Sequence, residues 1–291
     1  MKGRDIGLLL VLGAMWGSSF LFIKVAVGEV SPVFIVAGRA LFGLLALLAA
    51  APLLARIFGK SEPGLLRSLV LSWRPLLVLG IFNAALPFFT ISWGTQFMPS
   101  GTAAILNSTV PLFTAVLAGS LPFITDERLG LSGVAGILLG ILGVAVLAGG
   151  FGGGFSGTAS EALMGAGAVM TGSLSYAAGG LFARRTMKGV PVSVSAVGQN
   201  AAAFVLILPF AAFSAPDAMP GLPVVLSVVG LGAIGTGFSL LIYFKLIANV
   251  GATRTSTVTY LVPIWALFYG ALLLGEDITG RSVLGLALIL T

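Results

Sequence analysis

The side chains of this sequence that could do chemistry are amides and hydroxyls set inside long apolar stretches. The amides are Asn83, Asn107, Gln199 and Asn200, and Ser19 adds a hydroxyl. A polar side chain in an apolar medium is costly unless it meets a partner or water, and an amide must satisfy both its donor and its acceptor. We therefore expect these five side chains to face a shared cavity, although a serine can also bond the backbone of its own helix.

Four aromatic residues lie in the middle of apolar stretches, whereas Trp and Tyr commonly anchor a protein at the membrane interface. They are Trp16, Tyr176, Tyr260 and Trp265. Lining a cavity and packing between helices explain this depth equally well. With them included, the predicted substrate-binding residues are Trp16, Ser19, Asn83, Asn107, Tyr176, Gln199, Asn200, Tyr260 and Trp265. An apolar cavity with a few amides and hydroxyls suits a zwitterion with a hydrophobic side chain.

Three prolines, Pro87, Pro111 and Pro263, lie deep in apolar stretches. A proline frees a backbone carbonyl of the preceding turn and locally breaks a helix, which membrane proteins tolerate where the break lines a cavity. Pro111 and Pro263 correspond to each other in the two halves of the chain, and paired interruptions favour a transport site near the midplane. We predict gating or helix-breaking roles for all three, with simple kinks as the alternative.

Lys24 and Arg39 are the basic residues placed well inside the outer half of the predicted membrane region. Either side chain could extend to the membrane surface, with Glu29 as the candidate partner of Lys24. The sharper interpretation is that one of them binds a substrate carboxylate or a carbonyl of an outer gate. We assign Arg39 a gating role.

The composition gives little support to catalysis. The sequence has no Cys and no His, which removes thiol nucleophiles, imidazole bases and Cys/His zinc sites. No Asp or Glu falls at mid-membrane, which also argues against proton coupling of the small multidrug type. We predict no catalytic residue, no metal and no cofactor. The formal charge of +6 is spread along the chain without a basic face, so nucleic acid is not an expected partner.

Membrane-spanning helices must position these residues. Of 291 residues, 58% are hydrophobic and 8% are charged, against about 25% charged in soluble domains. Apolar stretches of about 20 residues, the length that a helix needs to cross the hydrocarbon core, alternate with short connectors. The sequence predicts an all-α membrane protein with ten spans, at 6–27, 32–54, 74–94, 101–121, 129–149, 162–182, 191–213, 222–244, 252–274 and from about 282.

The distribution of basic residues predicts the orientation. With a cytoplasmic N-terminus, twelve of the fifteen fall on the cytoplasmic side, where insertion retains them, and the exceptions are Lys24, Arg39 and Arg281. We expect a multi-pass protein of a bacterial-type inner membrane with both termini in the cytoplasm. The first stretch resembles a signal peptide but is too long and lacks a clear cleavage site. The stretch after Arg281 is too short to cross alone, so either the chain ends inside the bilayer or, as we expect, residues follow Thr291.

The sequence repeats itself at an offset of about 150 residues. Residues 93–102 align with 243–252, 110–113 with 262–265, and 127–129 with 276–278. Each unit has five predicted helices, and because five is odd, the second copy must enter the membrane in the opposite orientation. We therefore expect two inverted five-helix repeats, residues 1–150 and 151–291.

These residues resemble the drug/metabolite transporter superfamily and, within it, the ten-helix EamA-type exporters. The resemblance rests on Trp16-Gly17-Ser18-Ser19-Phe20 with Lys24, on Phe34 with Arg39, on the stretch from Gly101 to Phe113 and its counterpart from Gly251 to Pro263, and on Gly275-Glu276. It covers nearly the whole chain, apart from a longer connector at 120–126. The resemblance implies export of amino acids or similar small metabolites, and aromatic amino acids are substrates of some members.

We therefore expect a transporter and not an enzyme. It exports small metabolites, first of all amino acids with aromatic or hydrophobic side chains, by alternating access between the repeats. The alternatives are a passive channel, efflux of drug-like compounds and, with less support, a membrane-embedded enzyme. The expected partners are the small-molecule substrate and the lipid bilayer, and the protein is a monomer or a homodimer.

Overall fold

The computed structural model describes residues 2–50, 64–120, 131–148 and 158–290, and within these ranges all regular structure is helical. The first half contains α1 (Gly3–Ala26), α2 (Pro32–Ala49), α4 (Leu65–Leu71), α5 (Trp73–Gly80), η1 (Ile81–Ala85), α6 (Leu86–Thr95), α7 (Ser100–Asn107), α8 (Val110–Ser120) and α9 (Leu131–Ala148). The second half contains α10 (Ala159–Thr186), α11 (Val192–Ala212), α12 (Leu222–Gly232), η2 (Ala233–Phe238), α13 (Ser239–Val250), α14 (Ala252–Thr255), α15 (Val258–Leu274) and α16 (Gly280–Ile289). The connector that carries Glu127 and the predicted ends of the spans 32–54 and 129–149 lie outside the described residues.

Helices occupy the described parts of every predicted span, and many of them are long and apolar. In the part of the chain that the structure describes, six stretches have the length and hydropathy of a membrane span: Gly3–Ala26, Pro32–Ala49, Trp73–Thr95, Ser100–Ser120, Val192–Ala212 and Leu222–Ile247. Shorter apolar helices cover Val258–Leu274 and Gly280–Ile289. Large apolar side chains such as Leu45, Val205 and Phe210 point outward, with 51%, 67% and 63% of their surface exposed. Such an outer surface fits a lipid environment.

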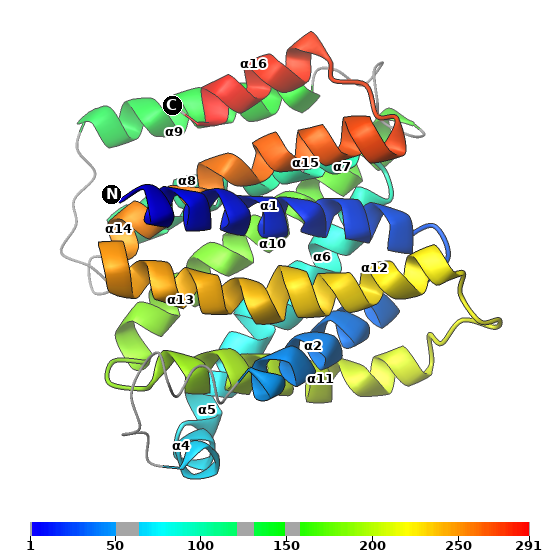
Figure 1. The fold of residues 1–291 in the computed structure, drawn as a ribbon. Helices are drawn as coiled ribbons and strands as arrows, with labels where there is room; N and C mark the ends of the chain where they lie inside the picture. Colours follow the sequence, from blue (N-terminus) through cyan, green and yellow to red (C-terminus); the bar gives the residue numbers. More distant parts are fainter. Residues whose placement is uncertain (1, 51–63, 121–130, 149–157, 291) are drawn as a thin grey trace.

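The helices form a bundle in which neighbours come from both halves of the chain. At one edge α9 packs against α16, and at the opposite edge α2 packs against α11 (Figure 1). Between these edges α1 packs against α15, and α10 against α6. The bundle has two ends. The N-terminal end holds the start of α1 and the end of α13, and the Lys24 end holds the α1–α2 connection and the start of α12 (Figure 1).

Two of the membrane-length helices contain a π-helical turn. In η1 the amide of Leu86 donates to the carbonyl of Ile81, and in η2 the amide of Ser239 donates to that of Ile234. Each bond spans five residues instead of four. A π-turn inserts an extra residue, which widens the helix and turns its side chains. Both turns border the same space in the middle of the bundle.

Pro87, in the first turn of α6, explains one contact of this region. A proline has no amide hydrogen, so carbonyls of the preceding turn lose a donor. The Ser175 hydroxyl of α10 donates to one of them, the carbonyl oxygen of Phe82, at 2.8 Å. This bond fixes α10 beside η1, and the next residue of α10 is Tyr176. The freed carbonyl is thus satisfied by a neighbouring helix, as the absence of water in a membrane requires.

Two further spans are interrupted by a short break. The break between α7 and α8 lies at Ser108 and Thr109, and the break between α14 and α15 lies at Ser256 and Thr257. At the second break the amide of Thr259 bonds only three residues back, to Ser256. Such tightened turns are common at helix ends.

Candidate functional site

A cavity of about 410 Å³ lies in the middle of the bundle. Its walls come from α1, α2, η1, α6, α7, α8, α10, α11, η2, α13 and α15, so both halves of the chain contribute. The volume falls within the range of about 300–1,000 Å³ that is usual for small-molecule sites.

Most of the predicted substrate-binding residues line this cavity. Seven of the nine do so: Trp16, Ser19, Asn83, Asn107, Tyr176, Gln199 and Asn200. They come from α1, η1, α7, α10 and α11. The structure therefore brings together side chains that are up to 184 positions apart in the sequence, from Trp16 to Asn200.

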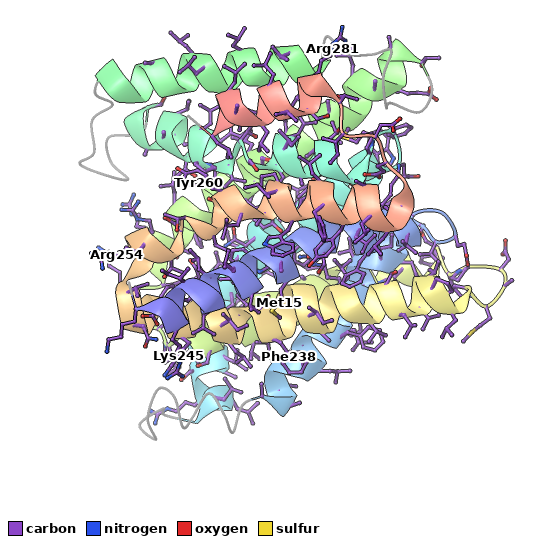
Figure 2. All side chains as sticks on the ribbon, turned by 45° about the horizontal axis from the view of Figure 1, so that its top comes forward. Met15, Phe238, Lys245, Arg254, Tyr260 and Arg281 are labelled. Carbon is purple, nitrogen blue, oxygen red and sulfur yellow. The ribbon has the colours of Figure 1, made fainter. Side chains whose placement is uncertain are left out.

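The structure does not bring Tyr260 and Trp265 to the cavity. On α15 the cavity-facing residues are Thr259 and Val262, and a helix turns by about 100° per residue, so Tyr260 faces away. Its side chain is 47% exposed and is labelled on α15 in Figure 2. Trp265 stacks on Tyr269, with ring centroids 5.6 Å apart.

Trp265 is held there by a close approach of α1 and α15. A Cβ atom on Gly17 would lie 2.6 Å from the Cβ of Trp265 and 2.9 Å from the carbonyl oxygen of Val262. Only glycine permits this distance between the two helices. Trp265 therefore takes part in helix packing.

The predicted gating prolines lie in three different settings. Pro111 lines the cavity at the start of α8, after the break at 108–109. Pro87 is buried at the start of α6 and frees the carbonyl bonded by Ser175. Pro263 is buried inside α15, which stays helical from Val258 to Leu274. A helix can tolerate a single lost amide bond when its other bonds persist, which explains why α15 continues through Pro263. The interruption of this span lies six residues earlier, at Thr257.

Arg39 lines the cavity from α2 and is half-buried. Its Nε donates to the Oγ1 of Thr236 in η2 at 3.0 Å, and its Cζ lies 3.7 Å from the centroid of the Phe88 ring. The Thr236 hydroxyl in turn lies 3.3 Å from the carbonyl oxygen of Leu231, five residues back. Since that contact takes the hydroxyl hydrogen, Thr236 is oriented to accept from Arg39. The π-turn η2 thus positions the guanidinium.

Among the residues that the structure describes, three polar atoms at the cavity wall are buried without a hydrogen-bond partner. They are the Oγ of Ser19 and the Oδ1 atoms of Asn83 and Asn200. Asn200 uses its Nδ2 to donate to the carbonyl oxygen of Ala196 at 2.9 Å, which orients its Oδ1. Buried polar atoms without partners are rare in proteins and each calls for an explanation. Here all three belong to residues that line one cavity.

The remaining wall is mostly apolar and aromatic. Trp16 and Tyr243 pack with ring centroids 5.4 Å apart, and Phe20, Phe88 and Tyr176 also contribute. Of the described residues that line the cavity, Arg39 is the only one with a charged side chain. The cavity therefore combines apolar surface, one cation and several unused acceptors.

Lys24 lies outside the cavity, at the end of the bundle named after it. Its Nζ donates to the carbonyl oxygens of Thr95 and Met98, at 3.0 and 2.8 Å. The first carbonyl belongs to the last residue of α6 and the second to the turn that follows, where the helix dipole is negative. Lys24 therefore ties α1 to the α6–α7 turn. The suggested partner, Glu29, instead accepts from the amide of Gly221 at 2.7 Å, at the start of α12.

Glu276, in the connection between α15 and α16, caps α7 at the same end. Its carboxylate accepts from the amide and the hydroxyl of Ser100, at 2.8 and 2.7 Å. A carboxylate at a helix N-terminus satisfies free amides and the dipole. Two glutamates therefore cap helices that belong to the other half of the chain.

Sequence reasoning missed Thr236, which holds Arg39. The sequence places it between Gly235 and Gly237, and Gly235 leaves room for Ser19, whose Oγ would lie 2.5 Å from a Cβ at that position. A threonine between two glycines inside an apolar stretch was a usable signal for an irregular helix turn, but not for its partner on α2.

Comparison with known proteins identifies the family. The model of the EamA-like transporter family matches residues 5–149 and 163–291. The protein named inner membrane transporter YedA of Escherichia coli K12 is 30% identical over 284 residues, which cover 97% of this chain and 87% of that protein. A probable amino-acid metabolite efflux pump of Salmonella typhimurium is 28% identical and covers 100% of this chain and 93% of its own length.

A solved structure supports the fold alone. It has a TM-score of 0.67 and 23% identity, and the match covers 100% of this chain and 94% of that one. The family match, the similarity to YedA and the apolar helices lead to one conclusion: the chain belongs to the EamA-like transporter family and is a multi-pass transporter of the inner membrane.

Proposed function

We propose that this transporter exports a small metabolite, with amino acids of apolar or aromatic side chain as the best candidates, by alternating access between two inverted five-helix repeats, residues 1–150 and 151–291. The central cavity is the observation that carries the proposal. Trp16, Asn83 and Asn107 reach it from the first half, and Tyr176 and Asn200 from the second. A site built by both halves suits this mechanism, because movement of one half against the other opens it to each side in turn.

Several observations support the two repeats. Counted by predicted spans, the third span and the eighth each contain a π-turn, η1 and η2, and the fourth and the ninth each contain a break. Helices at corresponding places pack on each other, α2 on α11 and α9 on α16. The family model also matches the chain as two separate stretches. Paired irregularities of this kind accompany a transport site between repeats.

The walls of the cavity support the substrate class. Rings such as those of Trp16, Phe88 and Tyr243 offer an apolar surface to a side chain, and the amides offer hydrogen bonds to polar groups. A relative of similar length is named a probable amino-acid metabolite efflux pump. The size and polarity of the cavity and the similarity to this relative therefore favour a small amphiphilic metabolite as the substrate.

The placement of basic residues supports a cytoplasmic N-terminus. Lys245 and Arg254 lie at the same end of the bundle as the start of α1 (Figure 2), and Lys2 and Arg4 belong to that start. Basic residues accumulate on the cytoplasmic side. Export then runs from the N-terminal end towards the Lys24 end.

Flux in liposomes tests the function. The purified protein is reconstituted, and radiolabelled amino acids, nucleosides and drug-like compounds are screened for uptake and counterflow. We expect saturable uptake with counterflow for at least one apolar amino acid. Flux that rises linearly with concentration would support a passive channel, and movement of drug-like compounds without amino acids would refute the proposed substrate class.

A matched pair of amide variants ties flux to the cavity. Asn200→Ala removes an amide from the cavity wall, and we expect about a tenfold loss of uptake, as for one lost hydrogen bond to a substrate. Gln96→Ala removes an amide that bonds the carbonyl of Trp93 and does not line the cavity. This control should keep wild-type flux. Equal losses in both variants would mean that the cavity is not the site.

A further inference from the structure

Arg39 keeps most of its hydrogen-bonding capacity unused. A guanidinium has five N–H donors, and the structure shows one of them, at Nε, bonded to Thr236. Phe88 covers one face of its plane. Among the described residues no carboxylate bonds to it, and no Asp or Glu lines the cavity. The terminal nitrogens are therefore available to a ligand in the cavity.

A lone cation at this depth is unfavourable unless something neutralises it. Arginine inside a membrane protein pairs with an acid, with backbone carbonyls or with a ligand. The ring of Phe88 stabilises the cation partly. A planar carboxylate is the ligand that matches a guanidinium best, since two parallel N–H groups can bond its two oxygens.

Unused acceptors lie in the wall of the same cavity. Asn200 is 1% exposed and Ser19 5% exposed, and their Oδ1 and Oγ atoms have no partner. Asn200 commits its Nδ2 to Ala196, so its free atom is an acceptor. Ser19 lies beside Gly235, the neighbour of Thr236, which holds Arg39. Acceptors of this kind bind an ammonium or an N–H group.

We propose that the cavity selects by charge: Arg39 binds the carboxylate of the solute, Asn200 and Ser19 bind a hydrogen-bond-donating group on the same small molecule, and analogues without a carboxylate are excluded. The proposal rests on the proposed function and names the chemistry of its substrate. An organic cation meets the uncompensated charge of Arg39 and is repelled. A neutral amide leaves that charge buried and unpaired, which is the strongest basis for rejecting an analogue.

The test compares acids with their own analogues on the wild-type protein. The probes are L-phenylalanine and L-leucine, their carboxamides, and the amines phenethylamine and isoamylamine. Binding is measured in detergent from the ligand-induced rise in melting temperature, and flux is measured in liposomes. We expect each acid to bind and move at least about tenfold better than its amide or amine, since removing the partner of a buried charge is strongly penalised.

Variants of Arg39 assign this preference to one residue. Arg39→Gln should abolish the preference for acids and reduce their uptake at least about tenfold. Arg39→Lys keeps the charge but loses the paired N–H donors of the guanidinium, so it should retain part of the preference. Arg254→Gln removes an exposed arginine outside the cavity and should behave as wild type. The comparison of acids with amides needs no variant, so it remains decisive if Arg39→Gln does not fold.

The outcomes separate the two proposals. Saturable flux in which amides or amines move as well as acids, or a preference for acids that survives Arg39→Gln, overturns the charge selection and leaves the export function standing. Arg39-dependent binding of acids without any flux supports the selection and overturns the export function. Neither binding nor flux of any probe overturns both.

Discussion

Lys24 and Arg39 are two basic residues set inside the same apolar bundle, and the protein treats them in opposite ways. Lys24 is bonded to two backbone carbonyls at the end of α6 and lies within the field of Glu276. Arg39 contacts the hydroxyl of Thr236 and the ring of Phe88, has the phenol of Tyr176 nearby, and faces the cavity. Both charges are costly at depth. Lys24 is bonded by groups of the chain itself and so stabilises the fold. Arg39 has N–H groups without partners in the chain and so can bind a ligand.

The largest effect on stability is expected for a substitution of Lys24. Lys24→Met keeps the length of the side chain and removes both hydrogen bonds, so we expect the free energy of unfolding to fall by about 3 kcal/mol, since bonds to charged groups contribute about 1.5–3 kcal/mol each. Unfolding is followed by heat or denaturant in detergent. Arg254→Gln is the control, and an unchanged melting temperature for Lys24→Met would contradict a structural role.

A smaller loss is expected at Glu276. Glu276→Gln keeps an acceptor for Ser100 but removes the charge that faces the dipole of α7 and the nearby Lys24, so we expect about 1–2 kcal/mol of destabilisation. The neighbouring Asp277→Asn changes an exposed carboxylate and should cost little. If both variants melt alike, the cap of α7 does not contribute as described.

The hydroxyl of Ser175 should contribute less to stability than the carboxylate of Glu276. Ser175→Ala leaves the carbonyl of Phe82 without its donor, at a cost of about 1 kcal/mol. Pro87→Ala restores a backbone amide to the same turn. In this background Ser175→Ala should cost measurably less. A double-mutant cycle with no coupling between the two positions would refute the link between Pro87 and Ser175.

The smallest change in stability is expected at Arg39, in contrast to its large effect on transport. Arg39→Gln loses the bond to Thr236 but also removes a charge without a counterion, and the two effects nearly cancel, to within about 1 kcal/mol. Melting curves without ligand measure this. A loss as large as that of Lys24→Met would show that the charge of Arg39 is compensated in the empty protein, and the contrast between the two residues would disappear.

The sequence predicted which residues are polar at depth, and this was enough to find most of the cavity. Asn83, Asn107, Gln199 and Asn200 line it because an amide in an apolar helix has few other places to face. Depth alone does not give the direction of a side chain around its helix. Tyr260 and Trp265 lie at a suitable depth but point to the outer surface and to Gly17.

The helices were also predictable, because length and hydropathy determine a span. Their irregular turns were predictable only in part. Pro87 marks the end of η1, but no proline marks η2, and Thr236 acquires its role from Arg39, 197 positions away. A pairing of this kind depends on how the helices pack, and no local pattern in the sequence contains it.

The two exchanged helix caps make the Lys24 end of the bundle cooperative. Glu29 caps α12 from the α1–α2 connection, and Glu276 caps α7 from the α15–α16 connection. Pulling this end apart would break both caps and expose two helix termini in the same event. The free energy of that step is therefore shared between two distant connections. We expect this end of the bundle to open as one unit and not one loop at a time.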